Sequence, residues 1–457
     1  MRDLYDDIYT SASLMKIHIL GIGGTFMAGI AIIAKQLGHQ VTGSDKNLYD
    51  PMKTVLQDSK IAYIEGYNPK ILDKKFDLII VGNVMSRGTP IIERLLESNI
   101  KYISGPQWLY ENVLRDKYVI AVSGTHGKTT TSSIVAWILK SAKLNPSYLI
   151  GGQPINFNAP AKLTKSKYFV IEADEYDTSF FDKRSKYIHY RPDILIINNI
   201  EFDHADIFDD IDSIIKNFHH LIRIIPKNGN IIYNYDDKNI KKLLKKGIWS
   251  KEVSFTNKSN NKSSKWLLTK NKDKDNYLLM NNRKKSIIET NLIGLHNYKN
   301  ISLAIIAALQ IKVPLKKCLE AIKSFKGVKR RMELVDRKDH IIIYDDFAHH
   351  PTEIEGSIKS LKNNFKDKKI LSICEIKSNS MISGAHQKDL PKVLEQSHHS
   401  ILIRSDLSKW TLKSKKIIIY NNYEKILQYI NKNYNDIDII LIMSNKSTEK
   451  LRRHIGK

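Results

Sequence analysis

The stretch that most limits what this chain can fold into runs from Tyr118 to Ser132, YVIAVSGTHGKTTTS. Residues 118–122 are apolar and predict a buried parallel strand, whereas Lys128-Thr129-Thr130 predicts the start of a helix. The loop between them contains glycine, so backbone N–H groups, the positive helix end and the Lys128 charge would surround a phosphate. The Thr129 hydroxyl would then reach Mg²⁺. Val122 stands where the usual phosphate-loop pattern has a glycine, so the motif is a variant, and an ordinary glycine turn before a helix is the alternative.

Length and composition limit the class of protein. A chain of 457 residues is too long for one hydrophobic core, which predicts two to four domains. The sequence shows neither an apolar run of membrane-spanning length nor a signal-peptide pattern, so we expect no membrane partner. The two cysteines, Cys318 and Cys374, are too few for a disulfide framework and favour a reducing compartment.

The formal net charge of +25 makes nucleic-acid binding an alternative that has to be weighed. The lysines are scattered, and basic runs such as Lys241–Lys246 resemble solvated helix faces. Asparagine and isoleucine are abundant as well, which indicates a general drift in composition. We therefore expect no nucleic-acid partner.

The N-terminal part predicts a Rossmann-like βαβ unit. Residues 1–14 form an extension, after which the strand Lys16–Leu20 leads into a glycine-rich loop, a helix and a second strand that ends at Asp45. The glycines would let a pyrophosphate approach the helix N-terminus, and NAD, FAD and a UDP-sugar are all compatible ligands. Arg87, after the next strand, Phe76–Val81, either contacts the ligand or is a surface cation. The candidate substrate-binding residues here are Gly21, Gly23, Gly24, Asp45, Ser86 and Arg87.

Oxygen-rich loops follow two predicted strands of the central part. Tyr168–Ile171 runs into EADEYD, and Ile194–Ile197 runs into NNIEFDH. Carboxylate oxygens at strand ends beside a phosphate loop suit Mg²⁺. Because both loops carry such oxygens, the sequence predicts one Mg²⁺ site that is built from the ends of both strands. A solvated acidic loop is the alternative for the first stretch, and a structural histidine is the alternative for His204.

The rest of the chain continues the alternation of strands and helices. Residues 250–285 predict a small β excursion with loops. The motif GLHNYKN, residues 294–300, predicts the start of a helix. Its Asn297 either caps this helix or contacts a base or ribose of a ligand. The last part predicts a second Rossmann-like sheet. The predicted fold class is α/β, with an extension at residues 1–14 and domains at residues 15–112, 113–328 and 329–457.

Together these motifs resemble the Mur ligases, the ATP-dependent amide-bond-forming enzymes of peptidoglycan assembly. The resemblance extends from Lys16 nearly to the end of the chain. It is carried, in order, by GIGGTFMAGIA, SGTHGKTTTS, EADEYD, NNIEFDHAD, GLHNYKNISLA, GVKRRME and YDDFAHHPTE. It implies a cytoplasmic enzyme with a Rossmann-like UDP-binding domain, a central P-loop ATPase domain and a C-terminal Rossmann-like peptide-binding domain.

Two branches of this family fit best. One joins L-alanine to UDP-N-acetylmuramate, and the other joins the murein tripeptide L-alanyl-γ-D-glutamyl-meso-diaminopimelate to the same acceptor in peptidoglycan recycling. The stretches that resemble the tripeptide branch are GTFMAG, YDTSFFDKRSKYIHYRP, FDHADIF and KSNSM. The family implies that ATP phosphorylates the lactyl carboxylate of UDP-N-acetylmuramate and that the amine then attacks the acyl phosphate.

The resemblance also implies a role for individual residues, with ATP and Mg²⁺ as cofactors. Lys128 would neutralise charge on the transferred phosphoryl group, with Glu172 and His204 as its catalytic partners. Thr129, Glu172 and His204 match metal-site positions. ATP would be bound by Gly124, Thr125, His126, Gly127, Lys128, Thr129, Thr130, His296, Asn297, Arg331 and Asp346. The substrates would be bound by the six N-terminal residues named above and by His189, Arg191, Lys377, Ser378 and Asn379.

Three stretches depart from the family pattern. Lys216–His220 does not supply the carbamylated lysine that supports a second Mg²⁺ in many members. Lys377 stands where the tripeptide branch has an arginine. A compact ammonium group therefore replaces a planar guanidinium that can donate two parallel hydrogen bonds. Ser444–Thr448 replaces a glycine-rich loop.

Two alternatives lie outside the family. A nucleic-acid-binding ATPase would need a basic stripe with interleaved aromatic residues, which the sequence does not show. A nicotinamide-dependent oxidoreductase would explain the N-terminal glycines but not the SGTHGKTTTS loop. The oligomeric state stays open.

Overall fold

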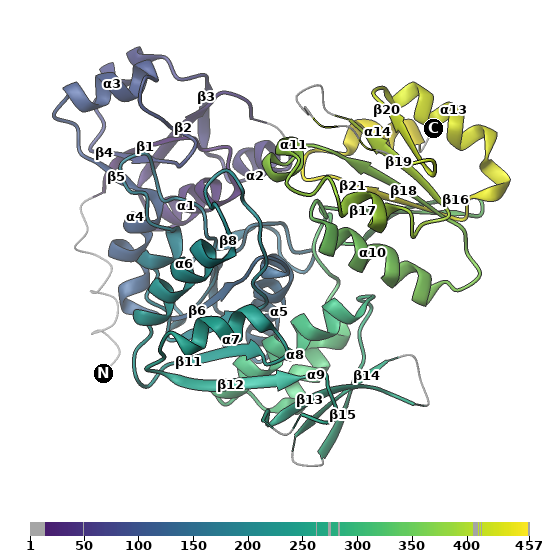
Figure 1. The fold of residues 1–457 in the computed structure, drawn as a ribbon. Helices are drawn as coiled ribbons and strands as arrows, with labels where there is room; N and C mark the ends of the chain where they lie inside the picture. The colour runs from purple at the N-terminus through teal and green to yellow at the C-terminus, as the bar shows by residue number, and fades with distance from the viewer. Residues whose placement is uncertain are drawn as a thin grey trace. The chain divides into compact units, whose positions relative to one another are not determined.

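The computed structural model describes residues 14–455, apart from residues 49, 262, 273–275, 282–283, 405–409, 411 and 413. Almost all of the predicted N-terminal extension therefore lies outside the described residues. The chain divides into two compact units, and each is described by itself (Figure 1). The first unit contains residues 1–121, 144–152 and 159–193, and the second contains residues 122–143, 153–158 and 194–457.

The N-terminal sheet of the first unit is parallel throughout, with the strand order β3-β2-β1-β4-β5. Its strands are β1 (Lys16–Leu20), β2 (Gln40–Asp45), β3 (Ala62–Glu65), β4 (Leu78–Val81) and β5 (Tyr102–Ser104). Its helices are α1 (Thr25–Gln36), α2 (Met52–Asp58), α3 (Pro90–Glu97) and α4 (Gly105–Asn112). Because β1 pairs with β2 on one side and β4 on the other, the order reverses beside the glycine loop, where such sheets bind ligands. The predicted Rossmann-like fold of this part is confirmed.

The first unit also contains a small group of strands from the middle of the chain. They are β7 (Ser147–Leu149), β8 (Ala161–Lys162) and β9 (Tyr168–Glu172). β7 pairs with β9 in parallel and with β8 in antiparallel fashion. β9 carries the first of the two oxygen-rich loops at its carboxyl end.

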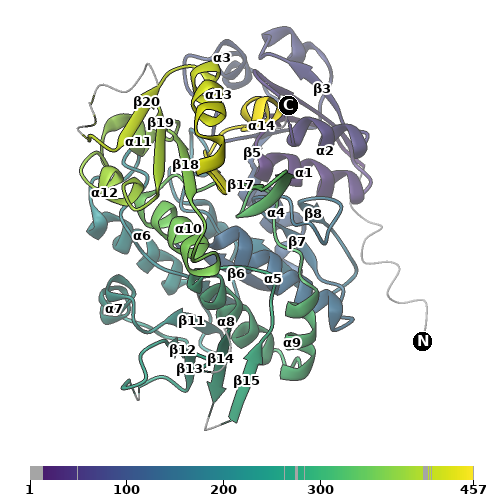
Figure 2. The ribbon, with the colours of Figure 1, turned by 90° about the vertical axis from the view of Figure 1, so that its right-hand side faces the viewer.

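The second unit begins within β6 and contains most of the central sheet, in the order β15-β14-β13-β12-β11-β10-β6. The strands are β6 (Tyr118–Ser123), β10 (Ile194–Ile197), β11 (Asn230–Asn234), β12 (Lys251–Thr256), β13 (Trp266–Lys270), β14 (Tyr277–Asn281) and β15 (Lys284–Ile288). The helices are α5 (Lys128–Ser141), α6 (Ile211–Arg223), α7 (Lys238–Lys245), α8 (Leu295–Gln310) and α9 (Leu315–Ser324). α5 and α8 lie side by side, as Figures 1 and 2 both show.

The predicted β excursion at residues 250–285 is confirmed, since β12, β13 and β14 lie in this range. β12 pairs in parallel with β11, β13 pairs in parallel with β12, and β14 and β15 follow as antiparallel strands. The structure adds that these strands continue the central sheet. The physical reason is that their backbone donors and acceptors pair with the open edge at β11.

The C-terminal sheet has the order β16-β17-β21-β18-β19-β20, in which only β16 is antiparallel to its neighbour. The strands are β16 (Glu333–Lys338), β17 (Ile341–Asp346), β18 (Ile370–Glu375), β19 (His399–Ile403), β20 (Ile417–Tyr420) and β21 (Ile439–Met443). The helices are α10 (Pro351–Asn364), α11 (Asn379–Ser383), α12 (Leu390–Leu394), α13 (Tyr423–Lys432) and α14 (Glu449–Ile455). The edge strand β16 was missed from the sequence because polar and charged residues make up most of it.

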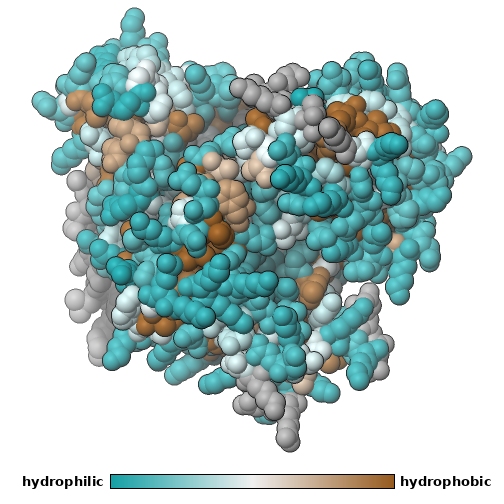
Figure 3. All heavy atoms as spheres, in the orientation of Figure 1, coloured by the Kyte–Doolittle hydropathy of each residue, from teal (hydrophilic) through white to brown (hydrophobic). Residues whose placement is uncertain are grey.

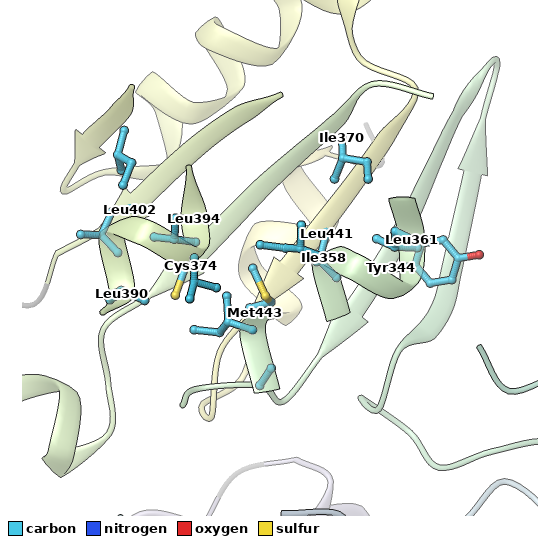
Figure 4. Packing of buried hydrophobic residues seen from close by; sticks show 14 of the residues in the cluster. Tyr344, Ile358, Leu361, Ile370, Cys374, Leu390, Leu394, Leu402, Leu441 and Met443 are labelled. Atoms are coloured by element: carbon cyan, nitrogen blue, oxygen red, sulfur yellow. The ribbon is translucent and has the colours of Figure 1, made fainter. Parts of the chain in front are cut away.

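Alternation along the strands builds a core on each face of this sheet. Ile439, Leu441 and Met443 pack with residues of α10 and α12, whereas Ile440 and Ile442 pack with residues of α13 and α14. Figure 4 shows Leu441 and Met443 among apolar side chains of the first cluster. Successive side chains point to opposite faces, so both faces of a parallel sheet need helical cover.

The face of the molecule drawn in Figure 3 is mostly hydrophilic, with apolar residues in small patches. None of the helices within the described ranges is long and apolar enough to cross a membrane.

The C-terminal core offers a test of the packing. We expect Leu441→Ala, at a fully buried position, to lower the free energy of unfolding by about 2–5 kcal/mol, because the cavity adds to the lost transfer energy. Ile419→Ala, at a position that is 41% exposed, is the control and should cost about 1 kcal/mol or less. Urea unfolding followed by circular dichroism measures both, and equal losses would contradict this account of the core.

Candidate functional site

The phosphate loop is fixed by the segment that follows β10. The His126 amide donates to Oδ1 of Asn199 at 2.8 Å, and Nδ2 of Asn199 donates to the His126 carbonyl at 3.2 Å. The Thr125 hydroxyl accepts a bond from the Glu201 amide at 2.8 Å. The loop therefore keeps its shape through polar contacts with residues more than 70 positions away.

Gly127 is required at the start of α5 for two reasons. Its φ is +80°, which side-chain-bearing residues rarely adopt. An added Cβ would also lie 2.5 Å from Nδ2 of Asn198 and 2.6 Å from Oδ1 of Asn300. The loop, the end of β10 and α8 are thus packed too closely for any side chain.

A cavity of about 450 Å³ opens beside this loop in the second unit. Its volume is within the range of small-molecule sites. The predicted ATP-binding residues that line it are His126, Gly127, Thr130, His296, Asn297, Arg331 and Asp346. Asn198 and Glu353 line it as well, and the buried Oδ1 of Asn198 makes no hydrogen bond. This lining fits a nucleotide, because it combines a phosphate cradle, an unused acceptor and charges of both signs.

His126 lies between two carboxylates. Its Nδ1 is 3.3 Å from Glu353, and its Nε2 is 3.6 Å from Glu201. Burial opposes protonation of the ring, but the two carboxylates outweigh burial and raise the pKa of His126 to about 10. The same contacts outweigh burial at the carboxylates, where they lower the pKa of Glu201 to about 2 and hold the pKa of Glu353 well below its usual range. His126 is therefore a cation at neutral pH.

The C-terminal part contributes Arg331 and Asp346 to the same cavity. Nη2 of Arg331 donates to the Thr129 hydroxyl at 3.5 Å, and its Nη1 lies 3.8 Å from Glu353. Burial raises the pKa of Asp346 to about 6, and the Met332 amide donates to its carboxylate at 3.4 Å. Burial also lowers the pKa of His296 to about 4, so this ring is neutral. The cavity is therefore lined by both neutral and charged polar groups.

The remaining predicted residues of the phosphate site lie on the loops at the ends of β6 and β10. Nζ of Lys128 donates to the Thr125 carbonyl at 3.4 Å, so the lysine folds back over its own loop. His204 has a φ of 56°, a region that residues other than glycine enter at a cost and often at functional sites. Its amide donates to Asp203, whose carboxylate also accepts from Ser380 at 2.9 Å. Gly124 has a φ of +127°, which only glycine tolerates well.

A second cavity, of about 390 Å³, lies within the first unit. Gly21, Gly23, Gly24 and Asp45 line it, as predicted for a substrate site of the N-terminal part, and Glu172 lines it too. Asp45 accepts from the Gly23 amide at 2.8 Å, so the acid also holds the glycine loop. Glu172 accepts from the Gly151 amide at 2.8 Å. Of the three predicted metal ligands, Glu172 belongs to the first unit, and Thr129 and His204 belong to the second.

Four predicted substrate-binding residues of the first unit do not line this cavity. Ser86 lies beside Arg87, whose exposed guanidinium pairs with Glu93 at 3.0 Å. Nε2 of His189 lies 2.9 Å from Asp182, and Arg191 donates to the Tyr110 hydroxyl at 2.7 Å. Arg87, His189 and Arg191 are held by local partners. Contact of all four residues with a substrate stays a prediction.

The predicted peptide-binding residues follow β18. Nζ of Lys377 lies 3.7 Å from Glu375, and its side chain is 41% exposed. The Ser378 hydroxyl caps α11 by accepting from the Met381 amide at 3.3 Å. Asn379 donates to Asp206 at 3.0 Å, which links α11 to the loop after β10.

Several lining residues were not recognised from the sequence. Glu201 and Glu353 stand inside the motifs NNIEFDHAD and YDDFAHHPTE, yet only the fold shows that both face His126. Lys186, in the first-unit cavity, pairs with Asp174 at 3.1 Å. The sequence showed only that these residues lie inside or beside a motif. It did not indicate which side chains contact one another.

Comparison with known proteins supports one family. Three family models match in order: "Mur ligase family, catalytic domain" at residues 16–117, "Mur ligase middle domain" at 122–308 and "Mur ligase, glutamate ligase domain" at 330–446. A UDP-N-acetylmuramate--L-alanyl-gamma-D-glutamyl-meso-2,6-diaminoheptandioate ligase of Escherichia coli (strain K12) is 45% identical over 87% of this chain and 86% of its own length. The chain belongs to the Mur ligase family. It is thus a ligase, and ATP dependence is a property of this family.

Two further Mur ligases place the chain within the family. The crystal structure of a murein peptide ligase from Psychrobacter arcticus 273-4 is similar, with 37% identity and a TM-score of 0.76 over 97% of this chain and 99% of that chain. A UDP-N-acetylmuramate--L-alanine ligase of Clostridium acetobutylicum is 32% identical over 93% of this chain and 94% of its own length. The three-domain α/β fold expected from the sequence is that of the family.

The strained glycine of the phosphate loop generates a prediction. We expect Gly127→Ala to reduce ATP-dependent phosphate release about 100-fold, because the methyl group displaces the loop from Asn198 and Asn300. Gly88→Ala is the matched control, since its φ of +84° is similar but nothing lies within 4 Å of the added Cβ. If both variants lost activity equally, backbone strain and not the close packing would be the cause.

Proposed function

We propose that this Mur ligase joins the tripeptide L-alanyl-γ-D-glutamyl-meso-diaminopimelate to UDP-N-acetylmuramate, with ATP as the energy source. The observation that carries the proposal is the 45% identity to a ligase named for this reaction, over 87% of the chain. The two cavities support it, because one is lined by a phosphate loop and the other by a glycine loop with an acid. The proposal places the reaction in the cytoplasm, on small-molecule substrates, in peptidoglycan recycling.

ATP is assigned to the cavity of the second unit. Its phosphates would meet the amides of the loop from Gly124 to Thr130, where the helix end is positive. Lys128 would move from the Thr125 carbonyl toward the γ-phosphate and stabilise the charge that develops there. His296 and Asn297 would face the nucleoside, and Arg331 and Asp346 would hold it from the C-terminal part.

Mg²⁺ is assigned to Thr129, Glu172 and His204. Their hydroxyl, carboxylate and imidazole groups fit a divalent cation, and the two oxygen donors suit Mg²⁺. When bound, the ion would neutralise charge on the phosphates. Thr129 would contribute from the start of α5, His204 from the loop after β10, and Glu172 from the end of β9.

UDP-N-acetylmuramate is assigned to the first-unit cavity. Gly21, Gly23 and Gly24 leave room for a pyrophosphate at the start of α1, and Asp45 would accept from the ribose. Lys186 brings a cation to the same cavity. We propose that domain boundaries near residues 112 and 328 separate this substrate site, the ATP site and the peptide site.

The tripeptide is assigned to the C-terminal part. A peptide with several carboxylates needs cations at its distal end, and Lys377 is exposed enough to serve as one. Ser378 and Asn379 lie beside it at the start of α11. The alternative amine donor, L-alanine, is favoured by one observation, the 32% identity to an L-alanine ligase.

The choice of amine donor tests the proposal directly. We expect kcat/KM for the tripeptide to exceed that for L-alanine by at least about 100-fold, because distal contacts position the amine against the acyl phosphate. Phosphate release is measured with purified protein, ATP, Mg²⁺ and UDP-N-acetylmuramate. Lys128→Ala is the negative control, because we expect it to abolish phosphoryl transfer and leave the residues of the peptide site unaltered. Equal kcat/KM values for the two amines would reject the tripeptide assignment in favour of the L-alanine ligase.

Lys377 gives a more local prediction. Loss of a charged contact costs about 1.5–3 kcal/mol, so Lys377→Ala should raise the tripeptide KM about 10–100-fold. Lys377→Arg should maintain or improve tripeptide use. The control is Lys392→Ala, an exposed lysine of α12 that pairs with Asp389. If the tripeptide KM of Lys377→Ala were unchanged, Lys377 would not belong to the peptide site.

A further inference from the structure

A group of nitrogen and oxygen ligands lies beside the ATP cavity but outside the predicted Mg²⁺ ligands. It consists of His126 of the phosphate loop, Glu201 of the loop after β10 and His350 at the start of α10, and is called the His126–Glu201–His350 cluster below. One ligand atom from each residue lies within 4.8 Å of the others. Nε2 of His126 is 3.6 Å from Oε2 of Glu201, and Nδ1 of His350 is 3.9 Å from the same oxygen. Three segments that are distant in the sequence therefore present metal-ligand atoms to one point.

Each histidine of the cluster is oriented by a second partner on its far side, whereas Glu201 is held at the oxygen that faces the histidines. Nδ1 of His126 faces Glu353 at 3.3 Å, and Nε2 of His350 faces the Phe202 carbonyl at 3.2 Å. With these N–H groups donated outward, loss of the second proton of His126 would leave Nε2 of His126 and Nδ1 of His350 with lone pairs toward the cluster. The Thr352 hydroxyl donates to Oε2 of Glu201 at 2.6 Å. Metal-bound histidines and carboxylates in proteins are held by outer partners of this kind.

One atom of the cluster has no hydrogen-bond partner. Nε2 of His126 is buried and makes no hydrogen bond, although the side chain as a whole is only 11% exposed. It faces Glu201 at 3.6 Å in an ion pair that is too long for a hydrogen bond, and a cation between the two groups would bond to both. Bonds of about 2.1 Å in a tetrahedral site place ligand atoms about 3.4 Å apart, so the observed 3.6 and 3.9 Å need only small shifts.

We propose that the His126–Glu201–His350 cluster binds a divalent transition-metal ion of the Zn²⁺ type. Two imidazoles and one carboxylate favour such an ion over Mg²⁺, which prefers oxygen ligands. Three protein ligands leave a fourth position for water or an anion. The ion would tie the phosphate loop, the loop after β10 and the start of α10 together, and so fix one wall of the ATP cavity.

Two existing contacts compete with the metal. A proton on His126 balances the two carboxylates in the metal-free protein. The Thr352 amide donates to Nδ1 of His350 at 3.2 Å, and the metal would take this lone pair. Binding therefore replaces a proton and a long hydrogen bond with three metal–ligand bonds.

The experiment uses Co²⁺ as a spectroscopic probe for this site. The full chain is stripped with a chelator and titrated with Co²⁺ in the absence of ATP, Mg²⁺ and UDP-N-acetylmuramate. We expect one equivalent to bind with the visible absorption of low-coordinate Co²⁺, and Zn²⁺ to displace it. Because no substrate is present, the result does not depend on the proposed ligase reaction.

Variants assign the bound ion to its ligands. Glu201→Gln and His350→Asn should each weaken Co²⁺ binding at least about 100-fold, and Glu353→Gln, which removes only an outer partner, should weaken it about 10-fold. His386→Asn is the matched control, because its ring contacts His350 at 4.5 Å between centroids but is not a ligand. Glu172→Gln should also leave binding unchanged. Thermal unfolding of the metal-free variants verifies that each one is folded.

Three outcomes would overturn the proposal. The first is the absence of stoichiometric Co²⁺ binding, which would leave the proton as the occupant of the cluster. The second is binding that Glu172→Gln abolishes and Glu201→Gln does not, which would assign the ion to the predicted Mg²⁺ ligands. The third is binding that none of the cluster variants changes, which would assign it to surface histidines.

Discussion

The ion pairs that His126 makes with Glu201 and Glu353 are the interaction on which the second unit depends most. They join the phosphate loop to the segment after β10 and to α10, whose sequence positions are far apart. A buried charge without its partner costs about 3–5 kcal/mol, so each member constrains where the other two can lie. The shape of the ATP cavity follows from this constraint, since all three residues line it.

Close packing supports the same region. Gly127 allows α5 to begin within contact distance of Asn198 and Asn300, and Asn199 holds the loop backbone on both sides of His126. Below the loop, β10 is apolar and fully buried from Ile194 to Ile197. Its polar groups begin at its carboxyl end, where parallel sheets bind ligands.

The first unit repeats this arrangement with different chemistry. Its glycine loop is held by Asp45, and its cavity adds Glu172 and Lys186 to the glycines. One acid and one cation beside a tight turn suit a nucleotide sugar, whereas the second unit has the lysine and threonines of a phosphate loop. The proposed assignment of a substrate site to the first unit and an ATP site to the second rests on these differences in residue type at the strand ends.

The sequence by itself determined the three-part α/β fold and the motifs typical of phosphate binding. It could do so because apolar runs, glycine turns and the spacing of Lys128 and Thr129 act locally, within one strand, loop and helix. Strands such as β1 and β10 were predicted at the bounds that the structure shows. The glycine loop and the phosphate loop were located by the same local patterns, and the binding of ligands by their residues stays a prediction.

Only the tertiary structure decided which of these groups meet. The pairing of His126 with Glu201 and Glu353, and the approach of His350 to the same point, depend on side chains from three separate segments. The order of β12 to β15 at the sheet edge likewise depends on which backbone edge is open. Local propensity carries no information on such long-range contacts, because burial and charge pairing are settled when the elements pack together.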